Sequence, residues 1–85
     1  MWLDAADISV KVRVLARLSR VQLGNFGDHR SVGDGISELR LFFGAGYRVY
    51  YMQQGNQVIV VLCAGDKSSQ VKDIQLAKQI ALEWR

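Results

Sequence analysis

Four side chains between positions 40 and 67 combine the positive charge and the aromatic ring that a site for single-stranded RNA needs. Arginine binds phosphate through paired hydrogen bonds, lysine acts as a point charge, and an aromatic ring can stack on an unpaired base. If the fold brings these side chains together, we expect them to bind RNA and to stabilise a reacting phosphate. The four residues are Arg40, Arg48, Lys67 and Tyr50.

The strands that carry these side chains can be predicted from the glycines between them. We expect strands over 36–43, 47–53 and 58–63, because glycine-centred turns separate three runs rich in β-branched and aromatic residues. Side chains alternate across a strand, so the two faces of the first hairpin can be assigned. The expected core face holds Leu39, Leu41, Phe43, Tyr47, Val49 and Tyr51. The opposite face holds Glu38, Arg40, Phe42, Arg48, Tyr50 and Met52.

The expected strand pairing brings the cations near one another. We expect Arg40 to lie opposite Tyr50 in the first hairpin. A two-residue turn in the second hairpin places Arg48 opposite Cys63, and the chain that leaves the last strand then carries Lys67 close to Arg48. The pattern therefore predicts one polar patch on this face of the sheet.

A helix is expected before the strands. Residues 4–23 show both strand-like alternation and helical spacing, but a run of this length without glycine or proline favours a helix. Asp7 can cap its start, and Gly24 with Asn25 can end it. One face of this helix is either a stripe that contacts phosphates or an ordinary solvated surface. It carries Arg13, Arg17 and Arg20.

A second helix is expected over 69–84, with Ser68 or Ser69 as its cap. The glycine-rich segment 24–35, between the first helix and the strands, is expected to be a loop. The fold class is therefore α+β: an N-terminal helix, a three-stranded antiparallel meander and a C-terminal helix in one domain over residues 1–85. The buried side of the last helix is marked by Val71, Ile74, Ala77, Ala81 and Trp84.

The composition excludes several kinds of site. Cys63 is the only cysteine and His29 the only histidine, which excludes an internal disulfide, a tetrahedral zinc site and a pair of catalytic imidazoles. The acidic residues are scattered, so we expect no metal and no cofactor. The net charge of +3 permits an RNA partner. No segment approaches the ~20 apolar residues of a membrane helix, so we expect no membrane contact and a cytoplasmic protein.

Several short segments, taken together and in order, carry a family resemblance. They are LGNFGD at 23–28, VGDG at 32–35, ELR at 38–40, GYRVYY at 46–51, GDKSSQ at 65–70, DI at 73–74 and AK at 77–78. With these segments the chain resembles the HigB-like "addiction module killer" branch of the RelE/ParE toxin superfamily. The resemblance extends over nearly the whole chain.

The resemblance implies a specific activity. Toxins of this kind enter the ribosomal A site and cut mRNA there, through attack of the substrate's own 2′-hydroxyl on the adjacent phosphate. It implies that Arg48 stabilises the phosphorane, that Lys67 contacts phosphate or transfers protons, and that Arg40 holds the RNA backbone. Tyr50 would stack on or orient the substrate, and Asp73 would be a polar residue of the site on the last helix. The implied partner is a cognate antitoxin, usually a small helix-turn-helix protein.

Relatives of this kind usually begin with a strand that is not found before the first helix here. We therefore expect an unpaired sheet edge and association into a homodimer. Two alternatives to the nuclease stay open within the superfamily, a gyrase inhibitor and an inactive remnant that binds an antitoxin. A further alternative is a plain solvent-facing sheet in which Glu38 pairs with Arg40. The group of three cations favours the nuclease.

Overall fold

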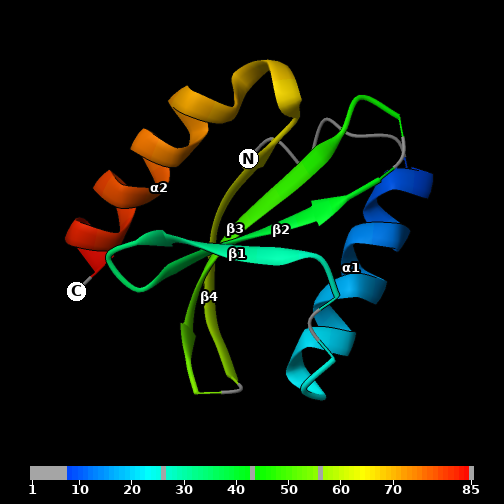
Figure 1. The fold of residues 1–85 in the computed structure, drawn as a ribbon, viewed down its shortest axis with the longest axis horizontal. Helices are drawn as coiled ribbons and strands as arrows, with labels where there is room; N and C mark the ends of the chain where they lie inside the picture. The colour runs from blue at the N-terminus through cyan, green and yellow to red at the C-terminus, as the bar shows by residue number, and fades with distance from the viewer. Residues whose placement is uncertain (1–7, 26, 43, 56, 85) are drawn as a thin grey trace.

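The computed structural model describes residues 8–25, 27–42, 44–55 and 57–84 of the chain. Two helices and four strands follow one another in the order α1 (Ile8–Gln22), β1 (His29–Gly33), β2 (Ile36–Leu41), β3 (Tyr47–Gln54), β4 (Gln57–Gly65) and α2 (Gln70–Trp84), with a short 3-10 helix η2 (Lys67–Ser69) before α2 (Figure 1). The predicted α+β class is confirmed, with one strand more than expected.

The additional strand is β1, which the sequence analysis assigned to a loop. It pairs antiparallel with β2, so the sheet has the order β1-β2-β3-β4. Its side chains are mostly exposed, and for this reason it has no apolar alternation to reveal it. The turn signal was present, because Asp34 and Gly35 both adopt positive φ, as a two-residue hairpin turn requires. With β1 in place, β2 is an inner strand, and the sheet ends at β1 and β4.

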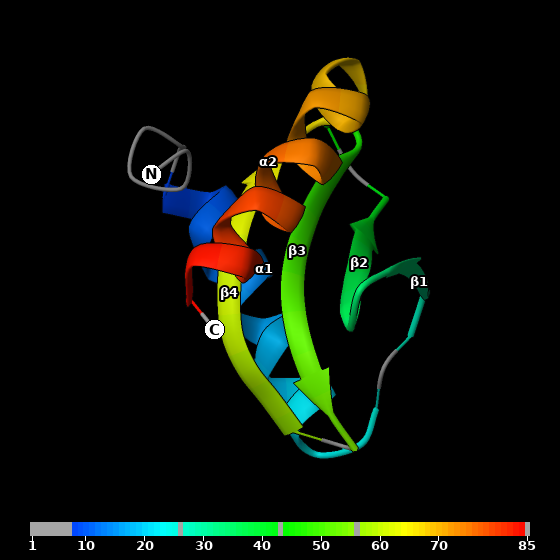
Figure 2. The same ribbon diagram turned by 90° about the vertical axis from the view of Figure 1, so that its left-hand side faces the viewer.

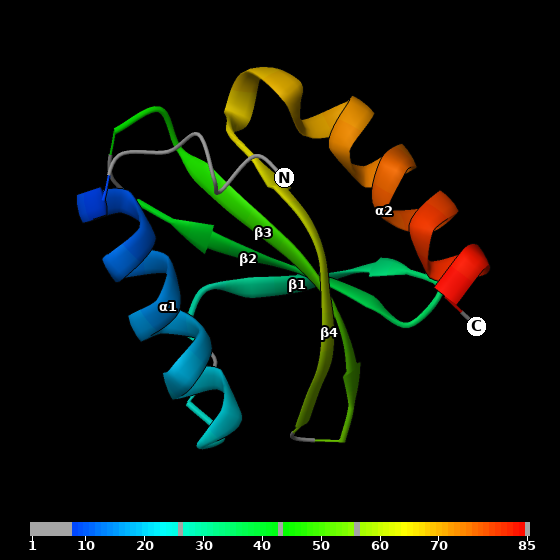
Figure 3. The ribbon, with the colours of Figure 1, turned by 180° about the vertical axis from the view of Figure 1, so that it is seen from behind.

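The helices cover opposite faces of the sheet (Figures 1 and 3). The predicted core face of the first hairpin packs against α1, so the prediction is confirmed for those of its residues that the structure describes. Phe43 lies outside the described residues. The first core consists of Val10, Val14 and Val21 of α1 with Leu39, Leu41, Val49, Tyr51 and Ala64 of the sheet.

The second helix covers part of the face that was expected to be polar and open. It lies along β3 and β4 (Figure 2). The second core consists of Ile36, Tyr50, Met52, Leu62, Cys63, Ala77 and Ala81. The expected burial of Val71 and Trp84 is wrong, since their exposed fractions are 71% and 52%. The side of α2 that faces the sheet carries the buried Ala77 and Ala81, with Ile74 and Ile80 packed partly buried beside them.

The register of β2 with β3 differs from the expected one by two residues. Arg40 pairs with Arg48, and Glu38 pairs with Tyr50. A shift of two residues keeps every side chain on its own face, so the assignment of faces holds although the pairs changed. Two irregularities between β3 and β4 shift that ladder as well, and Arg48 lies opposite Gly65 instead of Cys63.

The ends of both helices have local causes. Gly24 has positive φ, and the amides of Gly24 and Asn25 donate to the carbonyls of Val21 and Arg20, which ends α1 as predicted. The proposed start of this helix at 4–7, with Asp7 as its cap, lies outside the described residues. The expected cap residues, Ser68 and Ser69, lie within η2, and Asp66 caps η2. Neither helix, over the described ranges, has the length and apolar character to cross a membrane.

Candidate functional site

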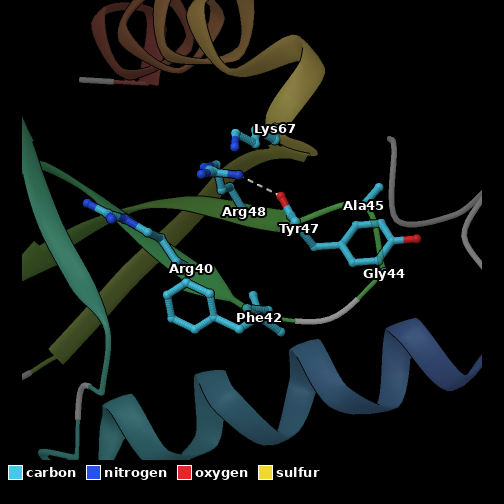
Figure 4. Close-up of a pocket in the computed structure, with 9 residues that line it drawn as sticks. Arg40, Phe42, Gly44, Ala45, Tyr47, Arg48 and Lys67 are labelled. Atoms are coloured by element: carbon cyan, nitrogen blue, oxygen red, sulfur yellow. Dashed lines mark hydrogen bonds between the residues drawn. The ribbon is translucent and has the colours of Figure 1, made fainter.

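Of the four predicted site residues, the three cations line one open depression. It has a volume of about 490 Å³ and lies between the β2–β3 turn and the start of η2 (Figure 4). We call it the basic depression. Its lining residues are Arg40, Leu41, Phe42, Gly44, Ala45, Gly46, Tyr47, Arg48 and Lys67. Arg40, Arg48 and Lys67 are thus brought together, whereas Tyr50 is not among them.

Arg48 is the most restrained of the three cations. Its Nη1 donates a hydrogen bond of 2.7 Å to the carbonyl oxygen of Gly46, and its Nε lies 3.8 Å from Glu38 Oε2. Only 13% of its side chain is exposed. These contacts hold the guanidinium in one orientation at the wall of the depression.

Lys67 is tied to the same turn through its backbone. Its amide donates to the carbonyl of Ala45 at 3.3 Å, which fixes η2 against the β2–β3 turn. Gly46 lies between the two cations, with positive φ, and a Cβ there would be 3.3 Å from Arg48 Nη1 and 3.4 Å from Lys67 Cβ. A glycine at this position therefore lets the backbone pass between two cationic side chains.

Two of the three cations, Arg40 and Arg48, lie beside one buried carboxylate. Glu38 is fully buried, and its Oε1 lies 3.0 Å from Arg30 Nε and 3.3 Å from Arg40 Nε. Its Oε2 accepts hydrogen bonds of 2.9 Å from Tyr50 and from Gln70 of α2. Burial alone would raise the pKa of Glu38, but the donors Gln70, Tyr50 and Arg30 and the positive charge of Arg30 outweigh it, and the pKa is lowered. Glu38 therefore stays ionised inside the protein.

Sequence reasoning recognised only one of these contacts, the pair with Arg40. The other donors come from β1, β3 and α2, and no spacing in the sequence shows that they converge on β2. A single acidic residue amid a run of strand residues with basic neighbours was the available signal.

Tyr50, which was predicted as a stacking or orienting group, does not line the basic depression. Its side chain is fully buried under α2, where its ring belongs to the second core. Burial raises the pKa of Tyr50, and the hydrogen bond to Glu38 with its negative charge raises it further. The phenol therefore stays protonated, and its ring is not available to a nucleobase.

Asp73 lies near the depression but does not line it. Its carboxylate accepts a hydrogen bond from the Ser69 hydroxyl, and it packs so closely on Gly65 that a Cβ there would lie 1.8 Å from Asp73 Oδ2. Cys63 donates to the Asp73 carbonyl at 3.4 Å, and burial, together with the charge of Asp73, raises the pKa of this thiol to about 11. Asp73 thus joins the start of α2 to the end of β4, and Cys63 is a small buried side chain.

The three arginines of α1 line a second depression of about 220 Å³, which we call the α1 depression. Its lining residues are Arg13, Ala16, Arg17, Arg20, Leu41 and Phe42. Arg17 Nη1 donates to the carbonyl of Arg40 at 3.1 Å and so connects α1 to β2. The two depressions share Leu41 and Phe42, and they are therefore neighbours on the surface.

The arrangement is suited to binding an anion and to stabilising negative charge. Among the described residues there is no group of three or more His, Cys, Asp or Glu side chains that could hold a metal ion. His29 lies on β1, where its Nδ1 is 3.2 Å from the Gly27 carbonyl, and it does not line the basic depression.

Comparisons with known proteins extend these observations. An uncharacterised protein of Haemophilus influenzae is 49% identical over 83 residues, which cover 96% of this chain and 84% of the relative. No solved structure showed significant similarity. The sequence profile of the family described as "Phage derived protein Gp49-like" matches residues 1–82. The chain therefore belongs to the phage-derived Gp49-like family, a family associated with toxin–antitoxin modules.

Proposed function

We propose that this protein is the toxin of a type II toxin–antitoxin module and that it cleaves mRNA on the ribosome at the basic depression. The observation that carries the proposal is the convergence of Arg40, Arg48 and Lys67 on one open depression. Support comes from the family's association with such modules and from the resemblance to HigB-like toxins of the RelE/ParE superfamily. A protein acting on ribosomes would work in the cytoplasm.

The chemistry that suits this site is attack by the substrate itself. The 2′-oxygen forms a bond to the adjacent phosphorus and loses its proton, while the bond from phosphorus to the 5′-oxygen breaks and that oxygen gains a proton. The products are a 2′,3′-cyclic phosphate and a 5′-hydroxyl. The intermediate phosphorane carries additional negative charge, and fixed donors aimed at that charge lower the barrier.

Each cation then has a role. Arg48, restrained by Gly46 and Glu38, supplies oriented donors to the phosphorane. Arg40 holds the RNA backbone, and the amine of Lys67 contacts phosphate or transfers a proton. In such a site, most of the rate enhancement comes from orientation of the reacting groups and from stabilisation of the negative charge on the phosphorane.

Tyr50 and Asp73 contribute indirectly in this proposal. Tyr50 holds Glu38, which orients two of the arginines, and Asp73 holds Ser69 and with it the turn that carries Lys67. Neither side chain touches the RNA.

The partner we propose is a small antitoxin, of the helix-turn-helix kind, that covers the basic depression. A homodimer formed through a sheet edge stays a prediction, with β1 and β4 as the strands available for it.

A non-catalytic binding module is the second candidate. The observation in its favour is that Tyr50 is buried and His29 does not line the basic depression, which leaves Lys67 and Tyr47 as the candidate proton carriers among the described residues that line it. Such a protein would bind gyrase or an antitoxin through the same cations without cutting RNA.

Inducing the protein in bacteria tests the proposal. The wild type should halt incorporation of labelled amino acids and produce cuts in mRNA at the A site. Arg48→Ala should lose this effect, because removal of an oriented donor lowers such rates roughly 10²–10³-fold. Lys78→Ala is the matched control, since this lysine pairs with Asp34 far from the basic depression. Full cleavage by Arg48→Ala would remove Arg48 from the mechanism.

A further inference from the structure

Phe42 is a large apolar side chain that the fold leaves in water. It follows the last residue of β2, and 80% of it is exposed. It lines both the basic depression and the α1 depression. Figure 4 shows its ring between the side chain of Arg40 and helix α1. Because the Phe42 ring is exposed, it contributes little to the packing of the domain, and its position between arginines is not explained by folding.

The surroundings of the ring match the pattern of a single RNA strand. Every nucleotide offers an anionic phosphate and a flat base, and proteins bind such strands with cationic grooves interrupted by aromatic rings. On one side of Phe42 lie Arg40, Arg48 and Lys67. On the other side lie Arg13, Arg17 and Arg20.

We propose that Phe42 is the stacking platform for one base of a single-stranded RNA whose backbone runs from the basic depression to the α1 depression. This inference rests on the proposed function, because it extends the substrate path beyond the reacting phosphate. It gives Phe42 the stacking role for which the buried Tyr50 is unavailable. Arg13 and Arg20 contact the flanking phosphates, and Arg17 holds α1 against β2 through the Arg40 carbonyl.

Binding of a fluorescein-labelled single-stranded RNA of about a dozen nucleotides to the full chain tests the stacking, measured by anisotropy over a range of salt concentrations. Phe42→Ala should weaken binding about 5- to 150-fold, the range for loss of one base–aromatic stack, and should leave the slope of affinity against salt unchanged. Arg20→Ala should reduce that slope by about 0.7, the amount for one phosphate contact in single strands. Phe42→Tyr should bind like the wild type. Leu82→Ala, a change to another exposed apolar residue but on α2, is the control.

The RNA provides a second, independent test. When single nucleotides are replaced in turn by abasic ones, one position should weaken wild-type binding as much as Phe42→Ala does. The same abasic RNA should have no additional effect on Phe42→Ala, because both changes remove the same stack. Equal sensitivity of the two proteins at every position would overturn the proposal.

The outcomes also separate this inference from the proposed function. If the wild type cuts mRNA and Phe42→Ala binds RNA equally well, the stacking role is wrong and the nuclease stands. If Phe42→Ala loses affinity for the cognate antitoxin but not for RNA, the ring belongs to a protein interface and the stacking role is wrong. If the wild type neither binds RNA at low salt nor cuts mRNA, both proposals fail.

Discussion

The hydroxyl of Tyr50 donates a hydrogen bond of 2.9 Å to Glu38 Oε2, and both side chains are fully buried. The same carboxylate lies beside Arg40 and Arg48, which are directly opposite each other on neighbouring strands. Two like charges in such positions repel one another unless an anion lies between them. The pair of Tyr50 and Glu38 therefore supports the placement of two of the cations in the basic depression, Arg40 and Arg48.

Tyr50→Phe should lower the free energy of unfolding by about 1.5–3 kcal/mol, because it removes one of the two hydrogen bonds that Oε2 of the buried, charged Glu38 accepts. Urea unfolding measures the difference. Tyr51→Phe is the matched control. Tyr51 is equally buried, burial raises the pKa of its phenol against the smaller opposing effects of Ser37 and Arg17, and its hydroxyl makes no hydrogen bond of good geometry among the described residues. Equal losses of unfolding free energy in the two variants would show that the hydrogen bond from Tyr50 to Glu38 does not stabilise the fold.

The stability of the fold should fall in acid because of Glu38. Its pKa in the folded protein is lowered from 4.5, so the unfolded chain takes up the proton first as the pH decreases. The stabilisation is fully present above pH 4.5 and is lost as the pH falls through the lower, folded-state pKa. Glu38→Gln removes this titration, and its deficit in unfolding free energy relative to the wild type should shrink toward acid pH. A deficit that stays constant with pH would contradict the assignment.

Much of the fold was predictable because alternation identifies a buried face. Leu39, Leu41, Val49 and Tyr51 were placed on the core face, where they lie. The opposite face was harder to interpret, because Tyr50 has a polar tip and a large apolar ring, and only the position of α2 decides that the ring is buried. Strand β1 was missed because its pairing is a backbone property that leaves no apolar pattern.

The candidate site was predictable in part for similar reasons. Arg40, Arg48 and Lys67 were expected together because the two arginines share a sheet face and Lys67 follows the strand that pairs beside Arg48. The shift of two residues at Arg40 and at Arg48 leaves this neighbourhood unchanged. The irregular pairing of β3 with β4 could not be read from the sequence, since it follows from packing. Five residues contact Glu38, three by donating hydrogen bonds and two as ion pairs; they come from several elements, and their convergence depends on tertiary structure.

Gly65→Ala should destabilise the junction between β4 and α2, because its Cβ would lie 1.8 Å from Asp73 Oδ2 and 2.7 Å from Ser69 Oγ. A loss of about 1–3 kcal/mol is expected for a side chain forced into a packed position, measured by urea unfolding. In an Asp73→Ala background the same change should be much less harmful, because the obstructing carboxylate is gone. If the loss is the same in both backgrounds, the close contact is not the cause.

Leu41→Ala and Val49→Ala should lower the unfolding free energy by roughly 2–5 and about 1–3 kcal/mol respectively, since both side chains lie in the core against α1. Leu82→Ala removes a side chain of the same type as Leu41 from an exposed position on α2 and should change stability little. Thermal unfolding ranks the three variants. A greater loss in Leu82→Ala than in Leu41→Ala would invert the assignment of buried faces.

The most direct test of the central claim is the chemistry of the cut RNA end. A reconstituted translation system is supplied with an mRNA that carries a 2′-deoxy nucleotide on the 5′ side of the mapped cleavage site, and with the unmodified mRNA in parallel. If the basic depression promotes attack by the 2′-hydroxyl, the unmodified mRNA is cut to a 2′,3′-cyclic phosphate and a 5′-hydroxyl, the deoxy mRNA stays intact, and Arg48→Ala cuts the former at least about 10²-fold more slowly. Cleavage of the deoxy mRNA at the same position, or undiminished cleavage by Arg48→Ala, would contradict the account.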